Sequence, residues 1–135
     1  MPTAWRVVKA VQSRRAVDGE GARLHGGRWN GPGRPAVYTS ETRALAMLEV
    51  LAGLGGTGQL PSYVLMDISF GEALVEDVAS PLPSGWDARP PGHVSQGMGD
   101  AWLTRATSAI LRVPSVVVPT EHNYVLNPAH PDFVK

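Results

Sequence analysis

Short runs of β-branched and aromatic residues recur along the chain and predict strands. WRVVK (5–9) is the first such run, and AVYT (36–39) is the second. SYVLMDIS (62–69) predicts a buried strand, because apolar residues fill its centre. The other predicted strands are a weaker one at 73–78, SVVV at 115–118 and a short one at 124–126.

Two segments have apolar residues at helical spacing. Ser40 can cap a helix over about residues 41–54, which ends in a glycine-rich stretch. Asp100 can cap a second helix to about residue 112, with apolar residues spaced along one face. Residues 10–35 and 79–99 are rich in glycine or proline and are predicted to be mostly loop.

Two helices among about six short strands predict an α+β fold, because a doubly wound sheet would alternate strand and helix regularly. A length of 135 residues fits a single domain covering 1–135. The content of 43% hydrophobic and 18% charged residues is that of an ordinary globular protein.

The charge balance and the residue types missing from the sequence narrow the function. Lys+Arg and Asp+Glu number 12 each. The chain therefore lacks the excess of basic residues that would indicate direct nucleic acid binding. Cysteine is absent, which excludes disulfides and thiolate catalysis and fits the cytoplasm. No apolar stretch approaches the roughly 20 residues of a membrane span, so we expect no membrane association.

Glu49 is the only charged residue in ALAMLEVLAGL (44–54). A helix that is apolar nearly all round is usually buried, and a buried carboxylate needs a partner, a proton or a polar cleft. No oppositely charged residue lies three or four positions away. The sequence therefore leaves two alternatives open for Glu49: it faces solvent at the helix margin, or it lines a cleft.

Arg28 lies among glycines in HGGRWNGPG (25–33). Glycine allows a ligand to approach the backbone closely, and the planar guanidinium suits phosphate or carboxylate. Tyr38, on the following predicted strand, could stack on a base or bond a sugar. The alternatives are an exposed turn arginine and a half-buried core tyrosine.

Several common motifs are absent or misplaced. The string GLGGTG (53–58) matches G-x-G-x-x-G but ends a predicted helix instead of following a strand, so we interpret it as a cap and turn. The four histidines lack metal-ligand spacing, and no metal is expected. No G-x-S-x-G elbow is present to indicate a hydrolase serine.

The order of five segments resembles the RES domain family, the toxins of RES–Xre toxin–antitoxin systems. The matching segments are GGRWN with Arg28, AVYTS with Tyr38, ALAMLEVL with Glu49, VPSVVVP with Ser115, and the tail HNYVLNPAHPDF with Asn127. The resemblance runs from Trp5 to Phe133.

The resemblance implies an ADP-ribosyltransferase-like mixed sheet with short helices and NAD as substrate. It implies that Glu49 stabilises the ribose, Arg28 binds the diphosphate and Tyr38 packs on nicotinamide or ribose. Ser115 would bond the ribose or nicotinamide region, and Asn127 is a further binding candidate. An Xre-type antitoxin would block the cleft.

Three functions remain in competition at this point. The first is a toxin that consumes NAD+ by hydrolysis or phosphorolysis. The second is a mono-ADP-ribosyltransferase that modifies a specific protein. The third is a non-catalytic nucleotide-binding module, which would need the pocket but not a shared cleft for Glu49 and Arg28.

Overall fold

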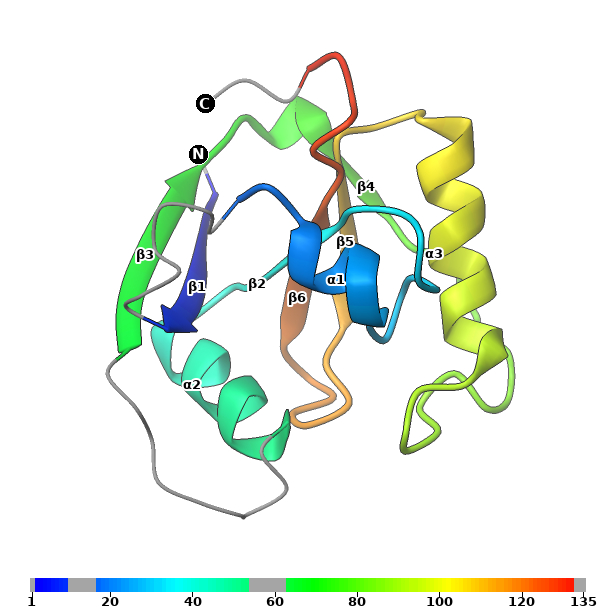
Figure 1. Cartoon of the computed structure of the whole chain (residues 1–135), viewed down its shortest axis with the longest axis horizontal. Helices are drawn as coiled ribbons and strands as arrows, with labels where there is room; N and C mark the ends of the chain where they lie inside the picture. The colour runs from blue at the N-terminus through cyan, green and yellow to red at the C-terminus, as the bar shows by residue number, and fades with distance from the viewer. Residues whose placement is uncertain (1, 10–16, 54–62, 133–135) are drawn as a thin grey trace.

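The fold is built on one six-stranded mixed sheet with strand order β3-β1-β2-β6-β5-β4 (Figure 1). The computed structural model describes residues 2–9, 17–53 and 63–132. The elements are, in chain order, β1 (Thr3–Lys9), α1 (Glu20–His25), β2 (Val37–Ser40), α2 (Arg43–Gly53), β3 (Tyr63–Ser69), the 3₁₀ helix η2 (Glu72–Leu74), β4 (Val75–Asp77), α3 (His93–Arg105), β5 (Ile110–Pro114) and β6 (His122–Leu126).

Most neighbouring strands in the sheet run antiparallel. β1 pairs with β3 along its whole length, and β2 pairs with β6 from Val37↔Leu126 to Ser40↔Asn123. β4 and β5 form a parallel pair, which makes the sheet mixed. The predicted α+β class with a mixed sheet and short helices is confirmed.

Both faces of the central strands are buried, because successive side chains of a strand point to opposite faces. Ile110 and Leu126 belong to one apolar cluster, which includes an edge-on contact between Phe70 and Tyr124. Leu111 belongs to the other cluster, on the face that α3 covers. The two clusters hold β5 and β6 rigidly in the middle of the fold.

The first predicted helix is present as α2, but its cap and its burial differ from expectation. The backbone N–H of Leu45 donates 3.0 Å to Thr42 Oγ1, so Thr42 and not Ser40 caps the helix. Leu45 is buried, whereas Leu48 and Leu51 are each 42% exposed. α2 therefore packs against β1 and β2 on one side only.

The second predicted helix was misplaced. α3 begins at His93 and ends before Ala106, whose φ of 53° is left-handed. Asp100 lies inside α3, and its carboxylate accepts the backbone N–H of Gly31 at 3.1 Å. The apolar residues at 110–113 form β5, which sits in the sheet between β4 and β6.

Three other predictions need correction. Residues 62–69 were expected to form a buried strand, but β3 lies at a sheet edge with Val64 and Leu65 exposed. Residues 115–118 form no strand, because Ser115 Oγ accepts the N–H groups of residues 117 and 118 in a local turn. The predicted loop 10–35 contains α1.

Some predictions fall outside the described residues. Of the glycine-rich string at 53–58, only Gly53 is described, and it is the last residue of α2. The predicted turn at 54–58 lies outside the described residues. None of the helices in the described part of the chain is long and apolar enough to cross a membrane.

Candidate functional site

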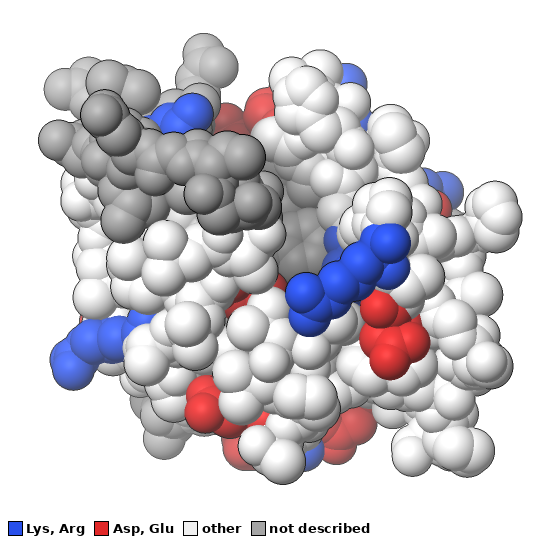
Figure 2. Space-filling model, turned by 90° about the horizontal axis from the view of Figure 1, so that it is seen from below, with Lys and Arg blue, Asp and Glu red and all other residues white. Residues whose placement is uncertain are grey.

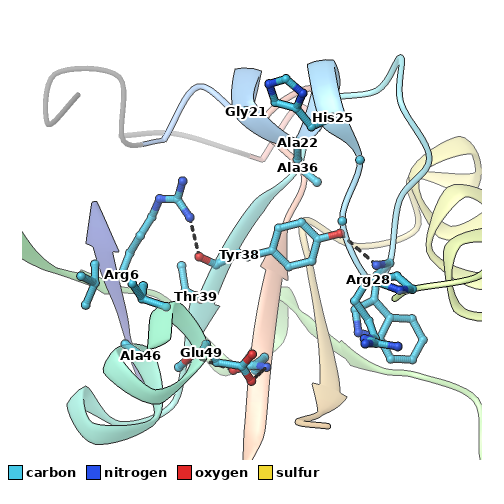
Figure 3. Close-up of a pocket in the computed structure, with 18 of the residues that line it drawn as sticks. Arg6, Gly21, Ala22, His25, Arg28, Ala36, Tyr38, Thr39, Ala46 and Glu49 are labelled. Atoms are coloured by element: carbon cyan, nitrogen blue, oxygen red, sulfur yellow. Dashed lines mark hydrogen bonds between the residues drawn. The ribbon is translucent and has the colours of Figure 1, made fainter. Parts of the chain in front are cut away.

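A cleft of about 1140 Å³ opens between α1, α2 and the strands β1 and β2. Figure 2 shows the hollowed face, with Lys and Arg side chains beside the hollow. Arg28, Tyr38 and Glu49 all line this cleft, and they come from different segments of the chain (Figure 3). Glu49 therefore takes the second alternative left by the sequence, since it faces a cavity that it shares with Arg28.

Two side chains hold the Glu49 carboxylate at one of its oxygens. Oε2 accepts a 2.7 Å hydrogen bond from Ser115 Oγ and another of 2.7 Å from Asn123 Nδ2. No hydrogen bond from a described residue reaches Oε1. The carboxylate is thus fixed through one oxygen, and the other remains available to a ligand.

Ser115 lies behind Glu49 and does not line the cleft. Its side chain is fully buried, and its hydroxyl accepts the N–H groups of Val117 and Val118 at 3.0 Å each. Its single proton is therefore directed to Glu49. The structure places this serine to orient the carboxylate, and a direct contact with a ligand would require its hydroxyl to leave three partners.

The hydroxyl of Tyr38 is occupied by the loop that carries Arg28. It donates to Asn30 Oδ1 and accepts the backbone N–H of Trp29 at 2.9 Å. Burial raises the pKa of this phenol well above its usual range. Tyr38 therefore stays neutral, and it offers the cleft its aromatic ring and not its hydroxyl.

Two buried side chains, those of Trp29 and Asn30, hold the segment GGRWN against the protein interior. Asn30 is fully buried, and its Nδ2 donates to the carbonyls of Ala22, Gly31 and Arg34 at 2.9–3.2 Å. Trp29 is 2% exposed and stacks on Trp86 with ring centroids 6.0 Å apart. Arg28, between these buried neighbours, is held on a fixed backbone.

Carbonyl groups of the proline-rich segment 79–92 hold the guanidinium of Arg28. Its Nη1 donates to Trp86 O at 3.1 Å and to Ala88 O at 2.6 Å. Partial burial and then the neighbouring Arg89 lower the pKa of Arg28, while Glu49 acts in the opposite direction. This segment, which was predicted only as a loop, positions one of the cleft's cations.

Two further arginines line the cleft and were missed from the sequence. Arg6, on β1, donates from Nη1 to Tyr38 O at 2.7 Å (Figure 3), and its buried Nε has no hydrogen-bond partner among the described residues. Burial lowers the pKa of Arg6, and Asp18 partly offsets this effect. Arg89 donates to Val116 O at 3.3 Å. A single arginine on a strand has no sequence pattern that marks it as a binding residue. Arg6 occupies an inward-facing position of WRVVK, but this alone does not indicate a cleft.

Asn127 lies outside the cleft lining. Its side chain is 3% exposed, and Oδ1 accepts the N–H of Ala129 at 3.0 Å in the turn after β6. The tail segment instead contributes Asn123 to the cleft. The described part of the chain contains no cluster of His, Asp and Glu residues suited to a metal ion.

The fold and the cleft define a small α+β protein that holds the carboxylate of Glu49 in a cleft lined by arginines and by two further acidic residues. A model of the RES domain family matches residues 3–135, and the chain belongs to this family. A Prs ADP-ribosylating toxin of Sphingobium sp. (strain YBL2) is 42% identical over 134 residues, which cover 95% of this chain and 83% of the relative.

Another sequence relative and a solved structure are also similar to this chain. A protein named Toxin Res from Photorhabdus laumondii subsp. laumondii is 38% identical, with 97% of this chain and 85% of the relative covered. A chain in the crystal structure of the M. tuberculosis MbcT–MbcA toxin–antitoxin complex has a TM-score of 0.74 at 24% identity. That likeness covers 93% of this chain and 73% of the other, and it shows the same fold.

Proposed function

We propose that this protein is the toxin of a toxin–antitoxin pair and that it consumes NAD+ in the cytoplasm by cleaving the nicotinamide–ribose bond. The observation that carries the proposal is the cleft shared with Arg28, in which Glu49 is fixed through Oε2 while Oε1 receives no hydrogen bond from a described residue. The toxin names of the relatives support the same conclusion.

The cleft suits a dinucleotide substrate in size and charge. Its volume of about 1140 Å³ is slightly above the roughly 300–1,000 Å³ of most small-molecule sites. Arg6, Arg28 and Arg89 supply guanidinium groups for a diphosphate, and Nε of Arg6 is a buried donor with no acceptor in the described part of the chain. The ring of Tyr38 offers a flat apolar surface for nicotinamide or ribose.

In the proposed reaction the bond between the ribose C1′ and the nicotinamide nitrogen breaks, and its electron pair leaves with nicotinamide. The ribose becomes positively charged, as in the oxocarbenium-like state of glycoside hydrolysis. Oε1 of Glu49 stabilises that charge or holds a ribose hydroxyl. Water or phosphate then adds to C1′ and loses a proton, which completes hydrolysis or phosphorolysis.

A mono-ADP-ribosyltransferase is the second candidate, because the 42% identical relative is named as an ADP-ribosylating toxin. The two activities use the same cleft and differ in the acceptor. Labelled NAD+ added to cell lysate separates them, since transfer leaves label on a protein band and hydrolysis or phosphorolysis leaves it in small molecules.

The partner in this proposal is an antitoxin, of Xre type by family resemblance, that covers the cleft. The structural relative was solved as a toxin–antitoxin complex, which supports a protein partner. Co-expression with the neighbouring small open reading frame tests this, since rescue of growth and a stable complex are expected.

Glu49→Gln tests the catalytic role, because it keeps the shape of the side chain and removes its charge. We expect the rate of NAD+ loss, measured by chromatography, to fall about 10²-fold or more, while the melting temperature stays unchanged. Glu72→Gln, on the exposed η2, is the matched control and should keep wild-type turnover. Equal turnover in both variants would remove Glu49 from the reaction.

A further inference from the structure

Asn123 contacts Glu49 and is itself oriented by a buried hydroxyl. Asn123 lies opposite Ser40 in the register of β6 and β2. Ser40 is 3% exposed, and its Oγ donates 2.7 Å to Asn123 Oδ1. The amide Nδ2 donates 2.7 Å to Glu49 Oε2. Three polar side chains from β2, β6 and α2 thus form one chain of hydrogen bonds.

The donors and acceptors in this chain have only one consistent assignment. An ionised carboxylate only accepts, so the NH₂ end of Asn123 must face Glu49. Its carbonyl end then faces Ser40, whose single proton must be donated to it. Glu49 therefore excludes the flipped amide, which would set a carbonyl oxygen against the carboxylate, and Ser40 holds the carbonyl end of the amide in place.

The two donors to Oε2 come from two neighbouring antiparallel strands. Ser115 follows β5, and Asn123 lies in β6, so both are attached to the buried centre of the sheet. Glu49 is carried by α2, a helix that is packed on one side only. The contact with Asn123 thus ties a carboxylate on a peripheral helix to the rigid part of the fold.

We propose that Asn123 is a positioning residue for Glu49 and that Ser40 anchors the side-chain amide of Asn123 through its carbonyl oxygen. The role is to keep Oε2 bonded to the sheet so that Oε1 faces the substrate. The kinetic part of this proposal rests on the NAD-consuming activity proposed above, whereas the hydrogen-bond assignment does not.

Asn123→Asp gives the sharpest kinetic test. It replaces the donor with a second carboxylate against Glu49, and two adjacent carboxylates tend to share one proton. Because the ionised form of Glu49 is the active one in the proposed mechanism, the acid limb of the kcat profile should move to higher pH. We expect kcat at pH 7 to fall about tenfold or more, with KM for NAD+ changed less than about threefold.

Two further variants separate positioning from loss of structure. Ser40→Ala removes only the orienting hydroxyl and should lower kcat by a smaller factor without moving the acid limb. Thr120→Asp, in the exposed turn before β6, adds the same charge away from Glu49 and should match wild type. An unmoved acid limb in Asn123→Asp, or a loss confined to KM, would overturn the proposal.

A readout without substrate distinguishes this proposal from the proposed function. The side-chain amide of Asn123 gives NMR signals in the free protein, and they should shift in both Ser40→Ala and Glu49→Ala. Amide signals that are the same in wild type and Glu49→Ala would disprove the contact even if NAD+ is consumed. Shifted signals with no NAD+ loss by the wild type would instead refute the proposed activity alone.

Discussion

Gly27 brings the backbone of the arginine-bearing loop against the ring of Tyr38. A Cβ added at Gly27 would lie 2.7 Å from Tyr38 Cε2, Cζ and the hydroxyl oxygen. Asn30 and the Trp29 N–H hold that hydroxyl in place, so the ring cannot move away without breaking hydrogen bonds. The glycine before Arg28 is therefore a packing requirement of the cleft.

Gly27→Ala should destabilise the fold by about 1–3 kcal/mol, the usual cost of overpacking, and lower NAD+ turnover through displacement of Tyr38. Gly21→Ala is the matched control, because nothing lies within 4 Å of a Cβ there and Gly21 is helical. It should be neutral or stabilising by up to about 1 kcal/mol. Urea titration of both variants checks this, and equal stability would contradict the contact.

At the residue scale the sequence directed attention to Arg28, Tyr38 and Glu49, which line one cleft. A lone charge in an apolar helix and an arginine among glycines are visible against their neighbours. Ser40 and Asn123 are not visible in this way, because a serine at a strand end and an asparagine in a strand have no periodic signature. Their significance comes from the pairing of β2 with β6, which only the structure gives.

At the scale of elements, α3 shows how packing overrides local preference. The prolines of residues 79–99 predicted a loop that extends over the first part of α3, and this part contains glycines, which usually weaken a helix. Gly99 lies directly against the Trp29 carbonyl, where a Cβ would be 1.6 Å from the oxygen. The helix can cross the loop only at a glycine, so a residue with low helix propensity is the one that permits the packing of α3.

Gly99→Ala should therefore destabilise the protein by about 3 kcal/mol or more, although alanine is the better helix former. Gly97, two residues earlier in α3, is exposed and has nothing within 4 Å of an added Cβ. Gly97→Ala should stabilise by up to about 1 kcal/mol. Thermal unfolding of the two variants measures whether each one is more or less stable than the wild type. A Gly99→Ala variant that is more stable than the wild type would refute the close contact.

The remaining elements differ in how far the sequence could specify them. β1, β2 and α2 follow from short apolar patterns with clear boundaries. β5 was absorbed into a predicted helix because Leu103, Ala106 and Ile110 match helical spacing by chance. The left-handed residue Ala106, which ends α3, carries no sequence signal of its own.

At the scale of the whole molecule, Arg28 is held by a segment nearly 60 residues away, through Trp86 O and Ala88 O. Arg28→Ala should weaken NAD+ binding by roughly 1.5–3 kcal/mol per charged hydrogen bond lost to the substrate. Calorimetry in a Glu49→Gln background, where turnover is suppressed, measures this. Arg34→Ala, exposed and outside the cleft lining, should bind as before, and an unchanged affinity for Arg28→Ala would contradict the assigned role.

Both hydrogen-bond acceptors that hold Arg28 are main-chain carbonyl oxygens. Every amino acid has this carbonyl group. Substitution at 88 leaves its oxygen in place, whereas one inserted or deleted residue displaces both oxygens by about 3.5 Å. Among homologues, the number of residues in this connection should therefore be preserved more strictly than their identity.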